Sequence, residues 1–198
     1  MRKILFVFGP LLLLFGGCAT VEEKAALAPM EPMAQPAPMR AGTVMNLIAN
    51  GKPGTEKVVA VDRGLYQFED NTGCVWKDDG LFMPAVAWDN CDGDSGTAEV
   101  KSVGNIWPLQ VGSKVSYTVA GNSTKGGAWN TVRNCTVTDA VSITTVSGPT
   151  DVYKVICTDS WQTHTFYVSP AAGRPVLMIR HHNTRGTTNT YELVSISQ

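Results

Sequence analysis

Short runs in which apolar and polar residues alternate dominate the chain from residue 43 onward. Val115, Tyr117 and Val119 alternate with polar residues, and Tyr153 and Cys157 belong to a second such run. A period of two places the apolar members on one face of a β-strand. Gly, Asn, Asp and Pro separate the runs at a spacing typical of sandwiches and barrels. We therefore predict a single all-β, antiparallel domain over residues 43–198, either a β-barrel or a β-sandwich. Further strands are predicted at 58–61, 65–68, 74–76, 135–143, 163–168, 176–180 and 190–196.

Three segments between the predicted strands have residue types that are typical of turns. Residues 121–127, rich in Gly, Asn and Ser, predict a loose hairpin loop. Residues 169–173 predict a turn, with Pro170 at a position that requires a fixed φ and Gly173 at a position that requires a positive φ. Residues 182–186 predict a third turn. The last two make residues 161–196 a meander.

The first eighteen residues have a different pattern. Arg2 and Lys3 precede an apolar run over residues 4–15, and small residues follow it. This is the order of a secretory signal peptide. Twelve apolar residues span only about 18 Å as a helix, against about 30 Å for the hydrocarbon core of a bilayer, so a permanent transmembrane helix is not predicted. Cleavage after Ala19, as in ordinary secretion, is one alternative.

The end of that segment, Gly16-Gly17-Cys18, resembles the lipobox of bacterial lipoproteins, although Phe15 stands where that family usually has Leu. The resemblance implies cleavage between Gly17 and Cys18, followed by attachment of diacylglyceryl and palmitate chains to Cys18. One acyl chain binds membranes only marginally, whereas several give stable attachment. Ala19, in place of Asp, implies the outer membrane, with the domain facing the periplasm or exposed at the surface.

Residues 18–42 contain four prolines and no aromatic residue. This composition predicts an extended, disordered tether with a reach of roughly 25–30 Å if flexible and up to roughly 75 Å if polyproline-like. The predicted organisation is therefore a signal peptide over 1–17, a lipidated tether over 18–42 and a β-rich periplasmic domain over 43–198.

Charge narrows the range of partners. The chain has 16 cations and 17 anions, and loss of Arg2 and Lys3 with the signal leaves 14 cations and a net charge of −3. The charges are scattered and form no basic block, which argues against nucleic acid as a partner. The predicted contacts are the membrane, through the lipid anchor, and an unknown envelope protein or glycan.

Apart from Cys18, the chain has four cysteines, and an even number in an exported protein indicates two disulfides. Three connectivities are possible, and we predict Cys74–Cys91 and Cys135–Cys157 because each pair brackets one plausible hairpin. A direct hairpin between Cys135 and Cys157 would centre on Val146, whereas the turn signal at residues 147–150 lies two or three residues later. A bulge or a diagonal geometry would reconcile the two positions; the third alternative is a different connectivity. A four-cysteine metal site is not predicted, since no Cys-x-x-Cys pair exists.

The loop after Cys91 contains two motifs that could carry chemistry. Residues 93–96, Gly-Asp-Ser-Gly, are similar to the nucleophile motif of chymotrypsin-like proteases, but all three histidines follow Ser95 in the chain. The acidic residues 89–94 could form an irregular calcium loop, although the EF-hand pattern fails at Ser95 and Lys101. We interpret this stretch as a polar loop.

Two other residue types are candidates. His181 and His182 are adjacent and face opposite sides of a strand, so they do not predict a shared zinc site. His164 could meet one of them across the 161–182 hairpin, but without a carboxylate to complete the ligand set a zinc site is not predicted. Five tryptophans could form a binding platform or could pack in the core. No catalytic residue, metal site or cofactor is predicted.

Residues 107–112, 153–157 and 166–176 together resemble a pattern in uncharacterised β-rich envelope proteins of proteobacteria. The resemblance covers residues 105–195 and implies fold and location only. We therefore expect a membrane-anchored envelope lipoprotein, not an enzyme, whose β-domain binds or stabilises another envelope component. The alternative is an inhibitor of a protease or lysozyme-type hydrolase that inserts loop 89–97 or 121–127 into a cleft.

Overall fold

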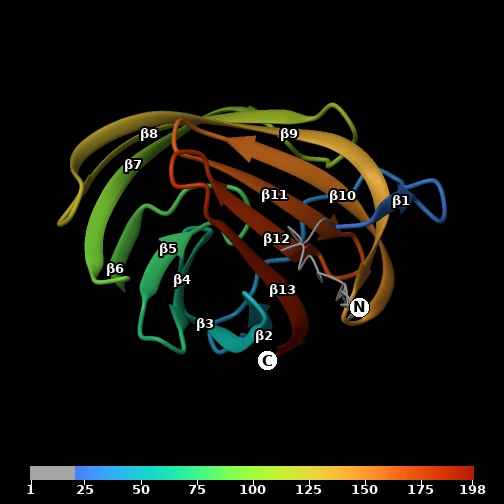
Figure 1. Cartoon of the computed structure of the whole chain (residues 1–198), viewed down its shortest axis with the longest axis horizontal. Helices are drawn as coiled ribbons and strands as arrows, with labels where there is room; N and C mark the ends of the chain where they lie inside the picture. Colours follow the sequence, from blue (N-terminus) through green and yellow to red (C-terminus); the bar gives the residue numbers. More distant parts are fainter. Residues whose placement is uncertain (1–20) are drawn as a thin grey trace, which may run out of the picture.

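Twelve antiparallel strands, β2 to β13, follow one another around a closed barrel in the computed structural model, which describes residues 21–198 (Figure 1). Each strand pairs with the next in sequence, and β13 also pairs with β2, so no strand of this ring is left at an open edge. This decides between the two predicted architectures in favour of the barrel. The strands are β1 (Glu23–Ala25), β2 (Val44–Ala49), β3 (Lys52–Asp62), β4 (Leu65–Asp70), β5 (Val75–Asp78), β6 (Ala87–Cys91), β7 (Asp94–Asn105), β8 (Lys114–Ser123), β9 (Gly127–Thr145), β10 (Gly148–Thr158), β11 (Gln162–Ser169), β12 (Arg174–His182) and β13 (Thr188–Ser197).

The apolar residues of the predicted alternating runs fill the lumen of the barrel. Val115, Tyr117 and Val119 of β8 face inward, and so do Val155 and Cys157 of β10. Burying apolar surface contributes roughly 25 cal/mol per Å², and a barrel lumen is the only place where every strand can bury one face at once. Among residues 21–198 there is no helix long and apolar enough to span a membrane.

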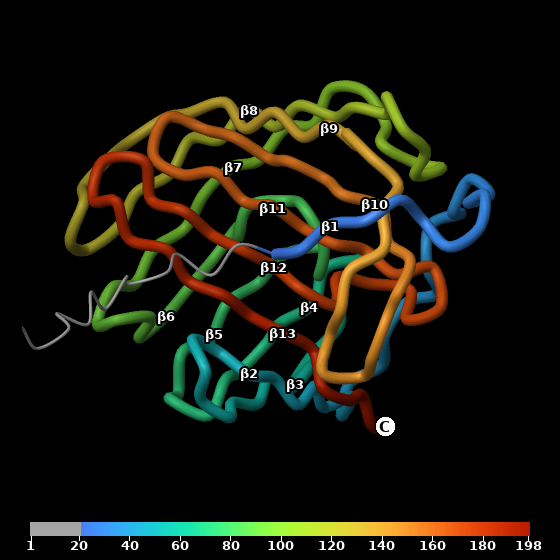
Figure 2. Tube along the Cα trace, turned by 45° about the vertical axis from the view of Figure 1, so that its right-hand side comes forward, coloured from blue at the N-terminus to red at the C-terminus, as the bar shows by residue number. Residues whose placement is uncertain are grey.

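The long hairpin of β9 and β10 bends over the outside of the barrel. The register shifts between Lys154 and Val155, which leaves Thr138 of β9 as a bulged residue. The predicted bulge is therefore present, and the turn is centred on Val146 and Ser147, slightly before the predicted position. The hairpin tip reaches β13, where the Val146 amide donates to Glu192 at 2.6 Å (Figure 2). A second apolar cluster packs on this outer side, built around Ile143, Val152, Tyr167 and Val176.

Both disulfides pair as predicted. Cys135 and Cys157 lie directly opposite each other on β9 and β10 and are buried in the core. Cys74 and Cys91 join the start of β5 to the end of β6. Each bond ties neighbouring strands, so both stiffen the barrel wall rather than linking distant parts.

The segment that precedes β2 is extended, as expected from its prolines, but it is docked rather than free. Met33 is 8% exposed, packs in the core and pairs with Leu109 through two backbone hydrogen bonds of 2.8 and 2.9 Å. Tyr153 donates to the Glu31 carbonyl at 2.8 Å, and β1 pairs with the far end of β9. The described part of the predicted spacer is thus held by methionine burial and backbone pairing, which its proline content alone did not indicate. We refer to residues 21–42 as the N-terminal strap.

Two predicted loops are shorter than expected. Asp94, Ser95 and Gly96 open strand β7, and the turn before them is confined to Asp92 and Gly93. Strand β8 likewise continues to Ser123, so the turn that follows covers only residues 124–126. Polar side chains suggested loops at both places, whereas strand pairing between β7 and β8 decides the backbone there.

Candidate functional site

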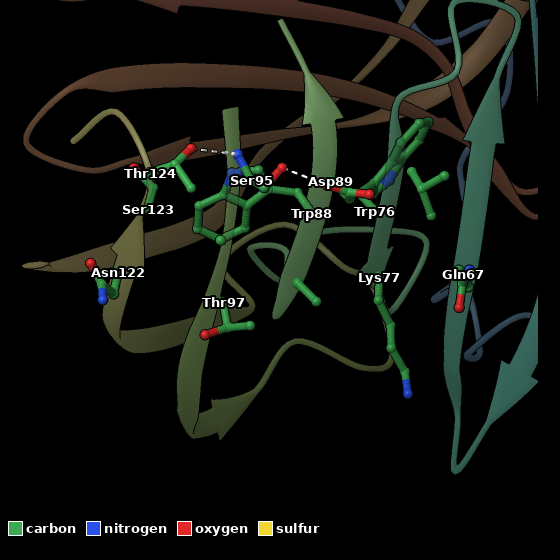
Figure 3. Close-up of a pocket in the computed structure, with 13 residues that line it drawn as sticks. Gln67, Trp76, Lys77, Trp88, Asp89, Ser95, Thr97, Asn122, Ser123 and Thr124 are labelled. Atoms are coloured by element: carbon green, nitrogen blue, oxygen red, sulfur yellow. Dashed lines mark hydrogen bonds between the residues drawn. The ribbon is translucent and has the colours of Figure 1, made fainter. Parts of the chain in front are cut away.

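An open groove crosses the outer face of β5, β6, β7 and β8 near one end of the barrel (Figure 3). Its volume is about 680 Å³. Alternation places two outward residues of each strand along the groove, and Gln67 of β4 lies at its side. The outward residues are Val75 and Lys77, Ala87 and Asp89, Ser95 and Thr97, and Asn122 and Thr124.

The hollow continues onto β9. A second depression of about 450 Å³ shares Thr97 and Asn122 with the first and extends to Ala128 and Asn130. Short side chains explain both depressions, because Ala87, Ala128 and their neighbours leave space that longer outer residues would fill. We call the two depressions together the outer groove. Its exposed surface is mostly apolar, with hydroxyl and amide groups interspersed and charges at Lys77, Asp89 and Glu99.

On the lumen side of the barrel wall, beneath the outer groove, tryptophan indoles pack against glycines of the neighbouring strands. Gly96 pairs with Trp88, whose indole occupies the space where a Gly96 side chain would be. Gly121 and Trp129 repeat the arrangement on β8 and β9. The Trp88 and Trp129 rings lie 6.4 Å apart inside the barrel. The groove floor is therefore backed by aromatic packing and cannot easily collapse inward.

Three turns at this end of the barrel are locked together. The Cys74–Cys91 disulfide joins the turn before β5 to the turn after β6. Asp94 then accepts hydrogen bonds of 2.9 Å from the Lys125 amide and from the Thr124 hydroxyl. Lys125 Nζ donates in return to the Asp92 carbonyl at 2.6 Å. We call this cluster of turns the braced rim.

Asp94 is the electrostatic centre of the braced rim. The hydrogen bond from the Lys125 amide, helped by the Thr124 hydroxyl and the Trp88 indole, lowers the pKa of Asp94 to about 2. Hydrogen bonds to a carboxylate favour its charged form. Asp94 therefore holds the turns together at any ordinary pH. Its oxygens serve these bonds, so the acidic loop is a braced turn and not an open cation loop.

Ser95 lacks the partner that a catalytic serine needs. Its hydroxyl donates to Asp89 on the outer face, and its amide donates to Thr124 at 3.1 Å (Figure 3). His164 is buried on the inner face of β11, where it lies opposite Arg180. A sheet therefore separates the two residues, and they cannot form a nucleophile–base pair.

The other histidines do not converge either. His181 is exposed and bonds to Thr188, while His182 is half-buried and bonds to its own turn. Within residues 21–198, no three His, Cys, Asp or Glu side chains gather in a way that could hold a metal ion.

The tryptophans are not a surface platform. Four of them continue the aromatic lining of the lumen, with Phe68 stacked on Trp76 at 5.3 Å and Trp129 edge-on to Trp161 at 5.0 Å. Trp107 lies near Phe82 instead. All five are half-buried. The packing interpretation of the tryptophans is therefore the one that the fold supports.

The lumen also holds charges that the sequence analysis did not single out. Arg133 forms a buried ion pair with Asp159 at 2.9 Å. His164 lies nearby, and burial lowers its pKa to about 3, with the Arg133 and Arg180 charges acting in the same direction. Arg133 shares the parity of Cys135 and Val137, a signal that could have placed it inside.

Comparison with known proteins supports the fold. No protein family profile matches the chain, and no curated protein sequence is significantly similar to it. The chain is similar to the structure of the hypothetical lipoprotein YmcC from Escherichia coli (K12), with a TM-score of 0.52, 10% identity and coverage of 80% of this chain and 90% of that one. A protein of Bacteroides fragilis NCTC 9343 with a YmcC-like fold gives a TM-score of 0.41 at 13% identity, covering 83% of this chain and 100% of that one. The first likeness establishes that this barrel is a known fold.

The predicted sites at Gly17 and Cys18 lie outside the described residues.

Proposed function

We propose that this protein is an exported, lipid-anchored envelope protein whose barrel binds another envelope protein through the outer groove and performs no catalysis itself. The signal-like segment ending at Gly17 and Cys18 supports export and anchoring. The similarity in fold to a protein described as a hypothetical lipoprotein agrees with that assignment. We further propose the outer membrane as the site of attachment, since Ala19 follows the cysteine.

The braced rim is the observation that carries the binding proposal. A surface whose turns are fixed by a disulfide and by Asp94 loses little conformational entropy when a partner docks. Turns with no binding role are ordinarily mobile and solvent-exposed. The rigid turns border the outer groove directly, because Ser95 and Thr124 belong to both.

The chemistry of the outer groove favours a protein as the partner. Its hydroxyl and amide groups suit the backbone of an extended polypeptide, and Val75 and Ala87 offer apolar contact. Lys77 is the one cation among the groove residues named above, and Asp62 pairs with it at 3.0 Å. A glycan platform would need widely exposed aromatic faces, whereas Trp76, Trp88 and Trp129, which border the groove, are half-buried.

Site-specific photo-cross-linking in living cells tests this proposal. A photoreactive residue at Thr97, in the outer groove, is expected to give an adduct of defined mass that contains a second envelope protein. Val103 provides a matched control, because it faces the same side of the same strand, is 70% exposed and lies outside the groove. Equal adducts from both positions, or an adduct with glycan alone, would contradict the proposal.

Anchoring is tested separately. Full-length protein is expected to incorporate labelled palmitate and to fractionate with outer membranes, whereas Cys18→Ala is expected to do neither. Palmitate on the Cys18→Ala protein would refute lipidation at that residue without affecting the groove proposal.

Inhibition of a hydrolase is the second candidate, and the exposed tip of the braced rim favours it. Lys125 and Asp92 lie at that tip, held to each other, in the manner of a preformed loop that could enter a cleft. A photoreactive residue at Lys125 separates the candidates. An adduct with a hydrolase from Lys125, without one from Thr97, would favour the inhibitor.

A further inference from the structure

A third, smaller cavity lies inside the barrel and is lined by residues of β2, β3, β4, β5, β11, β12 and β13. Its volume is about 170 Å³. Most of its lining is apolar, with Met45, Phe68, Trp76, Met178 and Leu193 among the contributing residues. Small-molecule sites are typically concave and apolar, with a few polar groups that fix orientation. We call this space the lumen cavity, and it is separate from the outer groove.

Oppositely charged residues line the lumen cavity without pairing. Glu56 and Asp78 contribute carboxyl groups, and Arg174 contributes a guanidinium group. Among residues 21–198, no ion pair within 4.0 Å joins Arg174 to either acid. The guanidinium instead contacts the Met45 sulfur at 2.7 Å, and a thioether is a weak acceptor.

The acids keep unused hydrogen-bonding capacity as well. Asp78 accepts a bond from the Gly80 amide at 2.6 Å and lies beside the Trp76 indole. The described part of the chain supplies no hydrogen bond to the Glu56 side chain. Glu56, Asp78 and Arg174 are half-buried, and each retains hydrogen-bonding capacity that a ligand in the cavity could use.

Ionisation behaviour agrees with this geometry. Burial, with a smaller contribution from the Asp70 charge, raises the pKa of Glu56 to about 7. Burial and the neighbouring Asp79 raise the pKa of Asp78 to about 8. Burial also lowers the pKa of the Arg174 guanidinium. Removal from water disfavours each charged form, while Arg174 and Glu56 partly stabilise each other's charge. A ligand that carries both charges would add a partner for each group.

We propose that the lumen cavity binds one small zwitterionic molecule with an apolar side chain. Its ammonium group lies against Glu56 and Asp78, and its carboxylate lies against Arg174. Its apolar part packs among the Met, Phe and Leu side chains of the lining. A cavity of about 150 Å³ holds benzene, so a single apolar amino acid of leucine size matches this space. The inference is independent of the outer groove.

Ligands with only one charge serve as comparisons. An amine such as 3-methylbutylamine would leave Arg174 unpaired, and a carboxylate such as 4-methylpentanoate would leave Glu56 and Asp78 unpaired. Leaving a buried charged group without a partner costs a further 1.5–3 kcal/mol or so, which corresponds to about tenfold or more in affinity. The zwitterion is therefore expected to bind tightest of the three.

The experiment uses full-length protein in detergent, with ¹³C-labelled methionine methyl groups as reporters. Leucine is expected to shift the Met45 and Met178 signals, which report on the cavity, and to leave Met30 unchanged. Calorimetry is expected to show leucine binding about tenfold or more tighter than either single-charge analogue.

Two variants complete the test. Glu56→Gln is expected to weaken leucine binding while leaving 4-methylpentanoate binding unaffected, and Arg174→Gln is expected to weaken both. Glu99→Gln, an exposed outer-face change, is the control for folding and should bind like the parent protein. The proposal is overturned if leucine shifts neither Met45 nor Met178, if all three ligands bind equally, or if Glu56→Gln binds leucine as the parent does.

Discussion

Two inward-facing glycines set the shape of the barrel wall at the scale of single residues. Gly96 and Gly121 have ordinary backbone angles, so their role is space and not conformational freedom. Each admits the indole of a cross-strand tryptophan, and the groove outside depends on that inner packing. A side chain at Gly96 would meet the Trp88 ring and the Asn122 carbonyl, and one at Gly121 would meet the Trp129 ring.

Gly96→Ala is therefore expected to destabilise the protein by about 1–3 kcal/mol, the usual cost of overpacking. Its Cβ would collide with the Trp88 ring and with the Asn122 carbonyl. Gly54→Ala is the matched control, because its Cβ would meet the end of Asn71 at 3.4 Å and the Ala49 Cβ at 3.9 Å, which are ordinary contacts. Chemical denaturation compares them, and equal stability of the two variants would contradict the packing described for Gly96.

The raised pKa values of the acids in the lumen predict how the stability of the protein depends on pH. The pKa of Asp78 is about 8 in the folded protein, against an ordinary value of 3.8, so between these values the folded state holds a proton that the unfolded state has released. Stability must then fall as pH rises through this range. The pKa of His164 is lowered to about 3, so above pH 6.5 this histidine is neutral in both the folded and the unfolded state. The loss of stability above pH 6.5 is therefore assigned to the lumen acids.

Asp78→Asn is expected to reduce the loss of stability between pH 6.5 and 8.5. At pH 8.5 the free energy of unfolding of the variant is expected to exceed that of the parent protein by on the order of 2 kcal/mol. The amide still offers an acceptor to Gly80. Asp92→Asn, in the exposed turn, controls for the change of residue type. Parallel melting curves for parent and Asp78→Asn across this range would show that the acid is not buried as described.

At the scale of elements, the sequence predicted the strands of β3, β4, β5 and β8 to β13, and both disulfides. Strict alternation and β-branched residues made those strands visible. Strands β2, β6 and β7 were missed. Around β6 and the start of β7, residues 89–96 carry turn-type side chains, while the partner strands β5 and β8 impose strand geometry. Barrel closure could not be predicted, since it depends on β13 meeting β2, more than a hundred residues away in the chain.

The candidate sites were less predictable than the strands. Ser95, Asp94 and the Cys74–Cys91 bond were singled out, but their joint role in a braced rim depends on Lys125, which lies in a different turn. Glu56 and Arg174 are ordinary surface residue types, and only the barrel brings them to one cavity. Residue pattern indicates which face a side chain occupies, but not which distant strand it will meet.

The N-terminal strap is the element whose behaviour departs most from expectation, and Met33 holds it. Met33→Asp is expected to release the strap, with loss of hydrogen-exchange protection at the Leu109 amide and a stability cost of about 2 kcal/mol. Gln35→Asp introduces the same charge at an exposed position of the same segment and is the control. Protection at Leu109 that survives in Met33→Asp would show that the strap is held elsewhere.

At the scale of the whole molecule, the barrel presents one rigid end and encloses a few charged residues in its lumen, among them the Arg133–Asp159 pair. The Cys74–Cys91 bond, the Asp94 bonds and the tryptophan layer all stiffen the region around the outer groove. The N-terminal strap is docked to the barrel from β1 onward, and only four residues separate the proposed lipidation site, Cys18, from β1. We therefore expect the anchored barrel to lie close to the membrane, within about 20 Å of the lipidated residue.

Filling the outer groove tests the central claim most directly. A photoreactive residue at Asn122 is expected to capture the envelope partner in cells, and Thr97→Trp in the same protein is expected to abolish the adduct by occupying the shared hollow. Val103→Trp, on the same face of β7 and outside the groove, should leave the adduct unchanged. An adduct that persists in the Thr97→Trp protein would contradict the assignment of the groove as the binding surface.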